Sequence, residues 1–197
     1  MKTINFCGDS FACMDGPTEV KLLMWQSILA KKLNCTITGT GKSGTAYEHA
    51  IKSFDAKTDY TIFCWTDSAR LWTKENIPMS FTLADKQKGK DKRYAAAYLY
   101  YKYLWDEQYC EQRYYRDLYW FDHEVLSEYK GLIIHLPCFD NIYQFTHGIN
   151  QQHKLFNFSF SRHAKAKSKE PEFANHLTKH ENAMLADKLY NIIKQHV

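Results

Sequence analysis

The sequence predicts an α/β protein, a three-layer α/β/α sandwich with a central parallel sheet. Short apolar runs alternate with amphipathic helical segments along the chain, which is the pattern of βαβ units. With 197 residues, the chain is long enough for one domain with a substantial core. Three of the apolar runs end in small polar residues, as strands do at the edge where parallel sheets bind ligands.

The first half of the chain alternates strands and helices. Each expected strand is a short apolar run, and each expected helix carries apolar residues at helical spacing. In chain order we expect a strand at Ile4–Cys7, a helix at Thr18–Ala30, a strand at Cys35–Thr38, a helix from Thr45 to about Phe54, and a strand at Tyr60–Trp65.

The second half has a long segment between strands. Pro78 and Gly89 indicate a loop over residues 71–92, and the lack of Gly and Pro over residues 93–130 predicts one helix or two, with a hinge near residues 106–113. We expect a single domain over residues 1–197, in which residues 71–130 form an insertion with long aromatic-rich helices. The remaining expected elements are a strand at Leu132–Leu136, a short edge strand at Leu155–Phe158, and a last helix capped by Thr178 and Glu181.

Composition and charge argue against several classes of protein. The net charge of +4 comes from 26 basic and 22 acidic residues, and the one dense basic run, Lys86–Arg93, is typical of a solvated loop. We therefore expect no nucleic-acid partner. Met1 and Lys2 lead directly into the first strand, with no signal peptide and no membrane-spanning run. The sequence thus predicts a cytoplasmic protein without a membrane partner.

Cysteines and histidines show no metal-binding spacing. The six cysteines form no C-x-x-C pair, so we expect reduced thiols, with Cys7, Cys35, Cys64 and Cys138 in or beside strands. His135 lies in an apolar strand and is expected to be a core residue. We predict no metal and no cofactor.

Three strand ends and one histidine form the candidate site. Ser10 follows the first strand in Gly8-Asp9-Ser10, Gly44 ends a glycine loop after the second, Thr66 and Asp67 follow the third, and His176 precedes the last helix. The ends of parallel strands lie on one edge, so these residues can converge. A serine hydroxyl needs an adjacent base to act as a nucleophile, and an oxyanion needs placed donors. From the residues alone, Ser10 is either a helix cap or a nucleophile.

These four blocks resemble the SGNH (GDSL-like) hydrolase family, in the family's order, from residue 8 to about residue 190. The resemblance implies the flavodoxin-like sandwich of that family. It implies that Ser10 is the nucleophile and His176 the general base, with Ser10, Gly44 and Thr66 holding the oxyanion. The W-T-D-x-x-R variant and the aromatic helices resemble a divergent phage-type branch, for which the location would be the host cell cytoplasm.

Two positions depart from the family pattern. Cys64 and Thr66 stand where the family has Gly and Asn, and a threonine hydroxyl is a shorter donor than an amide. Phe173 stands three residues before His176, where the family has Asp. Either Glu172 or a backbone carbonyl then orients the histidine, which gives a triad or a Ser–His dyad.

The leading functional hypothesis is a serine esterase that removes a small acyl group, such as an acetyl group from a carbohydrate, through an acyl-enzyme. Asp9, Asp67 and Arg70 are candidate substrate-binding residues, and Arg70 also suits a salt bridge with Asp67. One alternative is a catalytically weak or inactive binding or scaffold protein of the same fold. Another is a nucleotide-binding domain with residues 39–43 as a phosphate loop, although this loop is too short for the P-loop spacing.

Tyrosines are more numerous over residues 94–119 than one buried helix face can absorb. Aromatic residues at helical spacing pack mainly in the core, and the surplus predicts a cleft or a subunit contact. A homo-oligomer is therefore one of the possibilities that the sequence allows.

Overall fold

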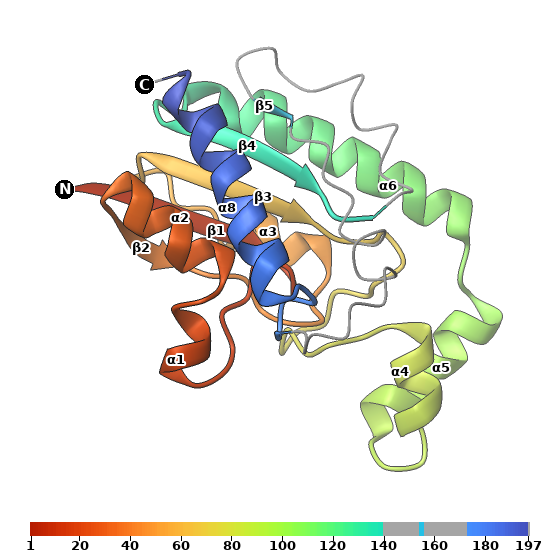
Figure 1. The fold of residues 1–197 in the computed structure, drawn as a ribbon. Coiled ribbons are helices and arrows are strands. Elements are labelled where there is room, and N and C mark those ends of the chain that lie inside the picture. The colour runs from red at the N-terminus through yellow and green to blue at the C-terminus, as the bar shows by residue number, and fades with distance from the viewer. Residues whose placement is uncertain (140–153, 156–172, 197) are drawn as a thin grey trace.

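The central sheet is parallel throughout, with the strand order β2-β1-β3-β4-β5. The structure is a computed structural model that describes residues 1–139, 154–155 and 173–196. It confirms the predicted α/β class (Figure 1). The strands are β1 (Lys2–Gly8), β2 (Cys35–Gly39), β3 (Tyr60–Trp65), β4 (Leu132–Pro137) and β5 (Lys154–Leu155).

Helices cover both faces of this sheet (Figure 1). On one face α2 (Trp25–Leu33) and α8 (Lys179–Lys194) lie side by side. On the other face lie α3 (Tyr47–Lys52) and α6 (Glu107–Trp120). The remaining helical segments are α1 (Thr18–Lys21), α4 (Phe81–Gln87), α5 (Lys92–Tyr103), the π-helical turn η1 (Phe121–Val125) and the 3₁₀ turn η2 (Leu126–Glu128).

Alternate residues of the inner strands supply two cores. Phe6 and Cys64 face α2 and α8, whereas Cys7, Phe63 and Trp65 face α3 and α6. This is the two-residue period of a strand, with both faces covered. Covering on both sides explains why Tyr60–Trp65 is an unbroken apolar run, since all six of its residues are buried.

The predicted helix at Thr18–Ala30 is wrong in its continuity, because the chain breaks between α1 and α2. Met24 has an extended backbone (ψ 148°) and is the residue before α2. The N–H of Trp25 donates to Asn182 Oδ1 in α8, at 2.8 Å. A tertiary hydrogen bond therefore takes the place of the intrahelical bond that continuous helix would make, and local propensity does not detect it.

The segment between β3 and β4 contains more helix than its sequence predicts. The expected loop over residues 71–92 contains α4, which begins after Ser80, whose side chain accepts a hydrogen bond from Leu83 N at 3.4 Å. The expected break is present but lies earlier than predicted, at residues 104–106: α5 ends at Tyr103, and α6 begins after Asp106, whose carboxylate caps Tyr109 N at 2.9 Å. Two helices, not one, therefore precede η1.

The last helix and the histidine of β4 agree with expectation. Thr178 and Glu181 form the predicted capping box, and α8 buries Leu185 and Leu189. His135 is fully buried, and its Nδ1 accepts a hydrogen bond from Trp65 Nε1 at 2.9 Å. A Trp N–H is a donor only, so Nε2 of His135 carries the ring proton and donates to Asp122 Oδ1 at 3.0 Å.

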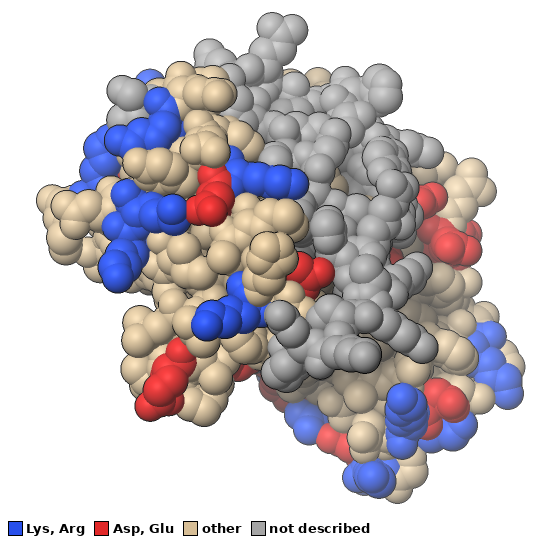
Figure 2. All heavy atoms as spheres, in the orientation of Figure 1, with Lys and Arg blue, Asp and Glu red and all other residues tan. Residues whose placement is uncertain are grey.

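The surface carries charges of both signs. Figure 2 shows Lys and Arg in separate groups on one face, with Asp and Glu among them. No helix of the described residues has the length and hydropathy needed to cross a membrane. The cysteines are free, as expected. The expected edge strand overlaps β5 only at Leu155, and residues 156–158 lie outside the described part of the chain.

Candidate active site

The strand order places the predicted strand ends at one point. The chain passes from β1 to β2 on one side and then returns to pair β3 with β1 on the other. Such a reversal opens a crevice at the carboxyl ends of the two strands, where open α/β sheets bind ligands. Ser10 is the second residue after β1, and Thr66 directly follows β3. Both residues therefore lie at this switch point.

Gly8 makes the turn that presents Ser10. Its φ is +154°, and a Cβ built there would lie 2.5 Å from the carbonyl oxygen of Cys64, so the position requires glycine. The carbonyl oxygen of Gly8 accepts from Lys42 N at 3.1 Å, and Gly41 N donates to Ala12 O at 3.0 Å. The loop after β2 is therefore hydrogen-bonded to the turn that carries Ser10.

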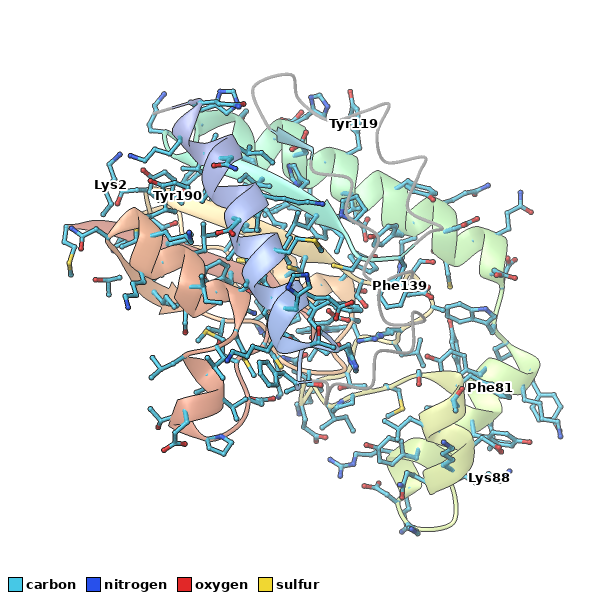
Figure 3. The ribbon with its side chains drawn as sticks, in the orientation of Figure 1. Lys2, Phe81, Lys88, Tyr119, Phe139 and Tyr190 are labelled. Atoms are coloured by element: carbon cyan, nitrogen blue, oxygen red, sulfur yellow. The ribbon has the colours of Figure 1, made fainter. Side chains whose placement is uncertain are left out.

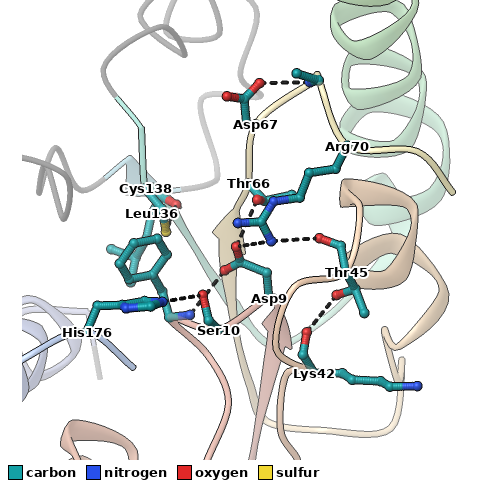
Figure 4. A network of polar contacts seen from close by, with 12 residues as sticks. Asp9, Ser10, Lys42, Thr45, Thr66, Asp67, Arg70, Leu136, Cys138 and His176 are labelled. Atoms are coloured by element: carbon teal, nitrogen blue, oxygen red, sulfur yellow. Dashed lines mark hydrogen bonds and ion pairs between the residues drawn. The ribbon is translucent and has the colours of Figure 1, made fainter. Parts of the chain in front are cut away.

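The structure brings Ser10 and His176 together. The distance from Ser10 Oγ to His176 Nε2 is 3.1 Å, across a sequence separation of 166 residues (Figure 4). This is hydrogen-bond reach for a nucleophile and its base. Ser10 is 2% exposed, whereas His176 is exposed. The ring of Phe11 lies 5.3 Å from the His176 ring and forms a wall beside it.

The turn that carries His176 has a left-handed residue at its centre. His176 itself has φ +62°, which is uncommon for a residue with a side chain. The turn is closed by hydrogen bonds from His176 N to Phe173 O at 2.9 Å and from Phe173 N to Leu177 O at 3.0 Å. These bonds hold the backbone in a conformation that aims the imidazole at Ser10.

Asn182 fastens this turn to the rest of the molecule. Its buried Oδ1 accepts from Trp25 N at 2.8 Å and from Asn175 Nδ2 at 2.7 Å. Its Nδ2 donates to Leu177 O at 3.2 Å. The sequence did not lead us to predict a role for Asn182. The feature that could have indicated one is a polar amide side chain on the apolar stripe of α8, one turn before Leu185.

Asp9 lies at the centre of a second network. Its carboxylate is fully buried, with Oδ2 accepting from Thr66 Oγ1 at 2.8 Å and pairing with Arg70 NH1 at 2.9 Å. Oδ1 accepts from Phe11 N at 3.1 Å. The structure thus brings Asp9, Thr66 and Arg70 together directly beside Ser10 (Figure 4). The Thr66 hydroxyl proton is directed at Asp9.

Asp67 and Arg70 do not form the expected pair. Asp67 Oδ1 accepts from Ala69 N at 2.8 Å, in a tight turn that points the carboxylate away from Ser10 (Figure 4). Arg70 NH1 instead bridges Asp9 and the carbonyl oxygen of Thr45, which it reaches at 3.1 Å. The guanidinium therefore joins the ends of β1 and β3 to the loop after β2.

Gly44 occupies a position that requires glycine. Its φ is +74°, and a Cβ there would lie 2.7 Å from Pro78 Cβ. No acceptor among the described residues takes the N–H of Gly44 or of Ser10. Both donors are thus available to a ligand, as far as the described residues show.

Two further positions bear on the chemistry. Phe173 lies in the histidine turn, at the position where the resemblance to SGNH hydrolases implies an acid, and Glu172 lies outside the described residues. Cys138 follows β4 near Asp9 and Arg70, and burial together with a hydrogen bond to Cys64 raises the pKa of its thiol well above its usual range. Cys138 is therefore a protonated thiol at neutral pH, and Ser10 is the candidate nucleophile.

Similar solved structures share this fold. A family two carbohydrate esterase from Clostridium thermocellum, in complex with cellohexaose, has a TM-score of 0.55 at 12% identity. An acetyl xylan esterase from the rumen bacterium Butyrivibrio proteoclasticus has a TM-score of 0.55 at 13% identity. A protein from Desulfitobacterium hafniense, assigned to the G-D-S-L lipolytic family, has a TM-score of 0.52 at 11% identity.

Coverage differs between these matches. Each includes 98% of this chain, which spans 64% of each of the two esterases and 99% of the third protein. No family model and no curated protein sequence matches the chain. At these identities the likeness establishes the α/β fold, which the carbohydrate esterases and the G-D-S-L protein share.

Proposed function

We propose that the protein is a serine esterase in which Ser10 is the nucleophile and His176 the general base. The observation that carries the proposal is the 3.1 Å contact between Ser10 Oγ and His176 Nε2 at the switch point of the sheet. A serine paired with a histidine at this distance has the arrangement that activates a hydroxyl for acyl transfer.

The proposed reaction has two half-reactions. Ser10 Oγ attacks the ester carbonyl carbon while His176 Nε2 takes the hydroxyl proton. The N–H groups of Ser10 and Gly44 stabilise the oxyanion of the tetrahedral intermediate. The bond to the alcohol then breaks, and His176 returns the proton to the leaving oxygen. Water, activated by the same histidine, hydrolyses the acyl-enzyme.

Asp9 and its partners have a positioning role in this proposal. Thr66 donates its hydroxyl proton to Asp9 and Arg70 neutralises the same carboxylate, so the three side chains brace the turn that carries Ser10. We therefore assign the oxyanion to the two backbone donors, with Thr66 acting through Asp9.

The proposed substrate is a small ester, such as an O-acetyl group on a carbohydrate. Ser10 is only 2% exposed, which favours an acetyl group over a long acyl chain. The carbohydrate part is supported by the acetyl xylan esterase and the carbohydrate esterases among the similar structures.

The orienting group of His176 separates two forms of the mechanism. In a triad Glu172 supplies a carboxylate, and in a dyad a backbone carbonyl serves. Glu172→Gln lowers kcat if the carboxylate orients the imidazole and leaves kcat unchanged in the dyad.

Hydrolysis of p-nitrophenyl acetate tests the proposal. Ser10→Ala is expected to lower kcat/KM by at least about a thousandfold, because the nucleophile is lost. Ser127→Ala is the matched control, since Ser127 is exposed in η2 and hydrogen-bonds only Glu124 O among the described residues. Equal rates for wild type and Ser10→Ala would reject the assignment.

A second candidate is a binding protein with a weak or inactive site. Phe173 in place of an acid and the near-complete burial of Ser10 favour it. A serine-directed fluorophosphonate distinguishes the two. Labelling of Ser10 that disappears in His176→Ala supports the esterase, and failure to label supports the binding protein.

A further inference from the structure

A hollow of about 490 Å³ lies beside the candidate active site, between the loop after β3, helices α4 and α5, and the start of α6. This volume is within the range of about 300–1,000 Å³ that is typical of small-molecule sites. We call it the aromatic hollow, because its lining includes four aromatic residues and two carboxylates: Phe81, Tyr101, Trp105, Phe139, Asp67 and Glu107.

Three of the aromatic rings form one continuous wall. The Tyr101 ring lies 5.2 Å from the Trp105 ring and 5.9 Å from the Phe81 ring. The Tyr101 hydroxyl donates to Ala69 O at 2.8 Å, which fixes the middle ring. Phe81 is 50% exposed, so an apolar surface is presented to solvent at the mouth. The wall is therefore held in place before any ligand arrives.

The charged groups that line the hollow are mainly hydrogen-bond acceptors. Asp67 and Glu107 are carboxylates, which accept hydrogen bonds from hydroxyl groups. Arg70 also lines the hollow, but its charge is paired with the buried Asp9 at 2.9 Å. The local charge is thus negative, which disfavours phosphates and acidic sugars and suits a neutral ligand rich in hydroxyls.

The aromatic hollow adjoins the Ser10–His176 pair through two residues. Arg70 contacts Asp9, the neighbour of Ser10. The Phe139 ring lies 5.6 Å from the ring of Phe11, which itself lies 5.3 Å from the His176 ring. Figure 3 labels Phe139 beyond β4 and Phe81 on α4, both of which line the hollow. A ligand seated there reaches toward the nucleophile.

We propose that the aromatic hollow binds a neutral sugar ring in the alcohol half of the ester. A pyranose has an apolar face of C–H groups, which packs on aromatic rings, and equatorial hydroxyls, which donate to carboxylates. In this arrangement the sugar ring stacks on the aromatic wall at Trp105, and its hydroxyl groups bind Asp67 and Glu107. The acyl group then points toward Ser10. This inference rests on the proposed esterase for the orientation, but not for the binding.

Calorimetric titration with neutral sugars that carry no ester group tests the binding without any catalysis. Xylohexaose, cellohexaose and chitohexaose are titrated into the full chain and into its Ser10→Ala variant. At least one of them is expected to bind both proteins equally, and Trp105→Ala is expected to weaken that binding about tenfold, as the loss of one stacked ring does. Trp120→Ala is the matched control, since Trp120 lies on α6 outside the hollow and is 52% exposed.

Two further measurements protect the test from a folding defect. Phe81→Ala removes an exposed ring and is expected to weaken binding with an unchanged melting temperature. On acetylated xylo-oligosaccharide, Trp105→Ala lowers kcat/KM about tenfold more than it does on p-nitrophenyl acetate, because only the former fills the hollow.

The outcomes separate this inference from the proposed esterase. Failure of all three neutral sugars to bind overturns it, as does unchanged binding in both Trp105→Ala and Phe81→Ala. Tighter binding of a galacturonic acid oligomer or of inorganic phosphate than of every neutral sugar also overturns it. If sugars bind as expected but Ser10→Ala leaves hydrolysis unchanged, the sugar site stands and the esterase proposal fails.

Discussion

At the scale of single residues, the buried carboxylate of Asp9 organises the site. Its identity within Gly8-Asp9-Ser10 is visible in the sequence, but its surroundings are not. Its partner Thr66 lies 57 residues along the chain, and only the pairing of β1 with β3 brings the two together. The sequence therefore predicts which residues gather at this edge, and the fold decides that Asp9 faces protein groups.

Removing the positive partner of Asp9 is expected to destabilise the protein. In Arg70→Met the carboxylate stays fully buried, and the Thr66 hydroxyl and the Phe11 N–H are the donors that remain to it among the described residues. Loss of one partner of a buried ion pair costs about 3–5 kcal/mol, and the two remaining donors favour the lower end. Urea denaturation measures the change in the free energy of unfolding.

The control for this variant is another arginine with carboxylate partners. Arg93 pairs with Asp91 and Glu75 on the exposed surface, where solvent screens the interaction. Arg93→Met is expected to leave the urea midpoint nearly unchanged. Similar losses in the two variants would contradict the structural role of the Arg70–Asp9 pair. Asp9→Asn combined with Arg70→Met is expected to recover part of the stability.

At the scale of elements, features that depend on neighbouring residues could be predicted from the sequence, whereas features that depend on tertiary contacts could not. The capping box of α8 is a short pattern and the structure confirms it. The break between α1 and α2 depends on the distant Asn182, so the sequence of the helix alone predicts one continuous segment. Helix α4 was missed although Ser80 marks its start, because Pro78 and Gly89 on either side indicate a loop.

Asn182 is expected to couple stability to catalysis. Asn182→Ala leaves the buried N–H of Trp25 without its acceptor and removes a tie to the histidine turn. An unsatisfied buried donor costs about 1–3 kcal/mol, and the lost positioning of His176 lowers kcat more than it raises KM. Denaturation and steady-state kinetics measure the two effects.

A second substitution at this position separates the roles of the amide oxygen and nitrogen. Asn182→Asp keeps acceptors for Trp25 N and Asn175 Nδ2 but loses the donor to Leu177 O. We expect helix pairing to survive better than in Asn182→Ala. A kcat equal to that of wild type in both variants would show that the amide does not position His176.

At the scale of the whole molecule, the class of fold followed from periodicity, since apolar runs and helical stripes alternate regularly. The strand order did not, because every permutation of parallel strands shows the same alternation. The order β2-β1-β3-β4-β5 puts the ends of β1 and β3 together, and with it the candidate site. The expectation of one domain with an insertion over residues 71–130, and those of a cytoplasmic location and a phage-type branch, stay predictions.

The separation of 166 residues between Ser10 and His176 affects how fast the site forms during folding. Loop closure makes contacts between distant residues slow to form, and parallel sheets depend on such contacts. After dilution from urea, we expect far-UV ellipticity to return before Ser10-dependent hydrolysis of p-nitrophenyl acetate. A brief unfolding pulse, too short for prolyl isomerisation, removes the competing slow phase.

If the two signals return together in that experiment, the histidine turn docks with the rest of the sheet and the delay is absent. If hydrolysis lags, the chain passes through a compact state in which β1 and α2 have formed and α8 has not yet delivered its histidine. Recovery of hydrolysis would then report the final step of folding. A chain in which α8 has not docked would be helical and compact but catalytically inactive.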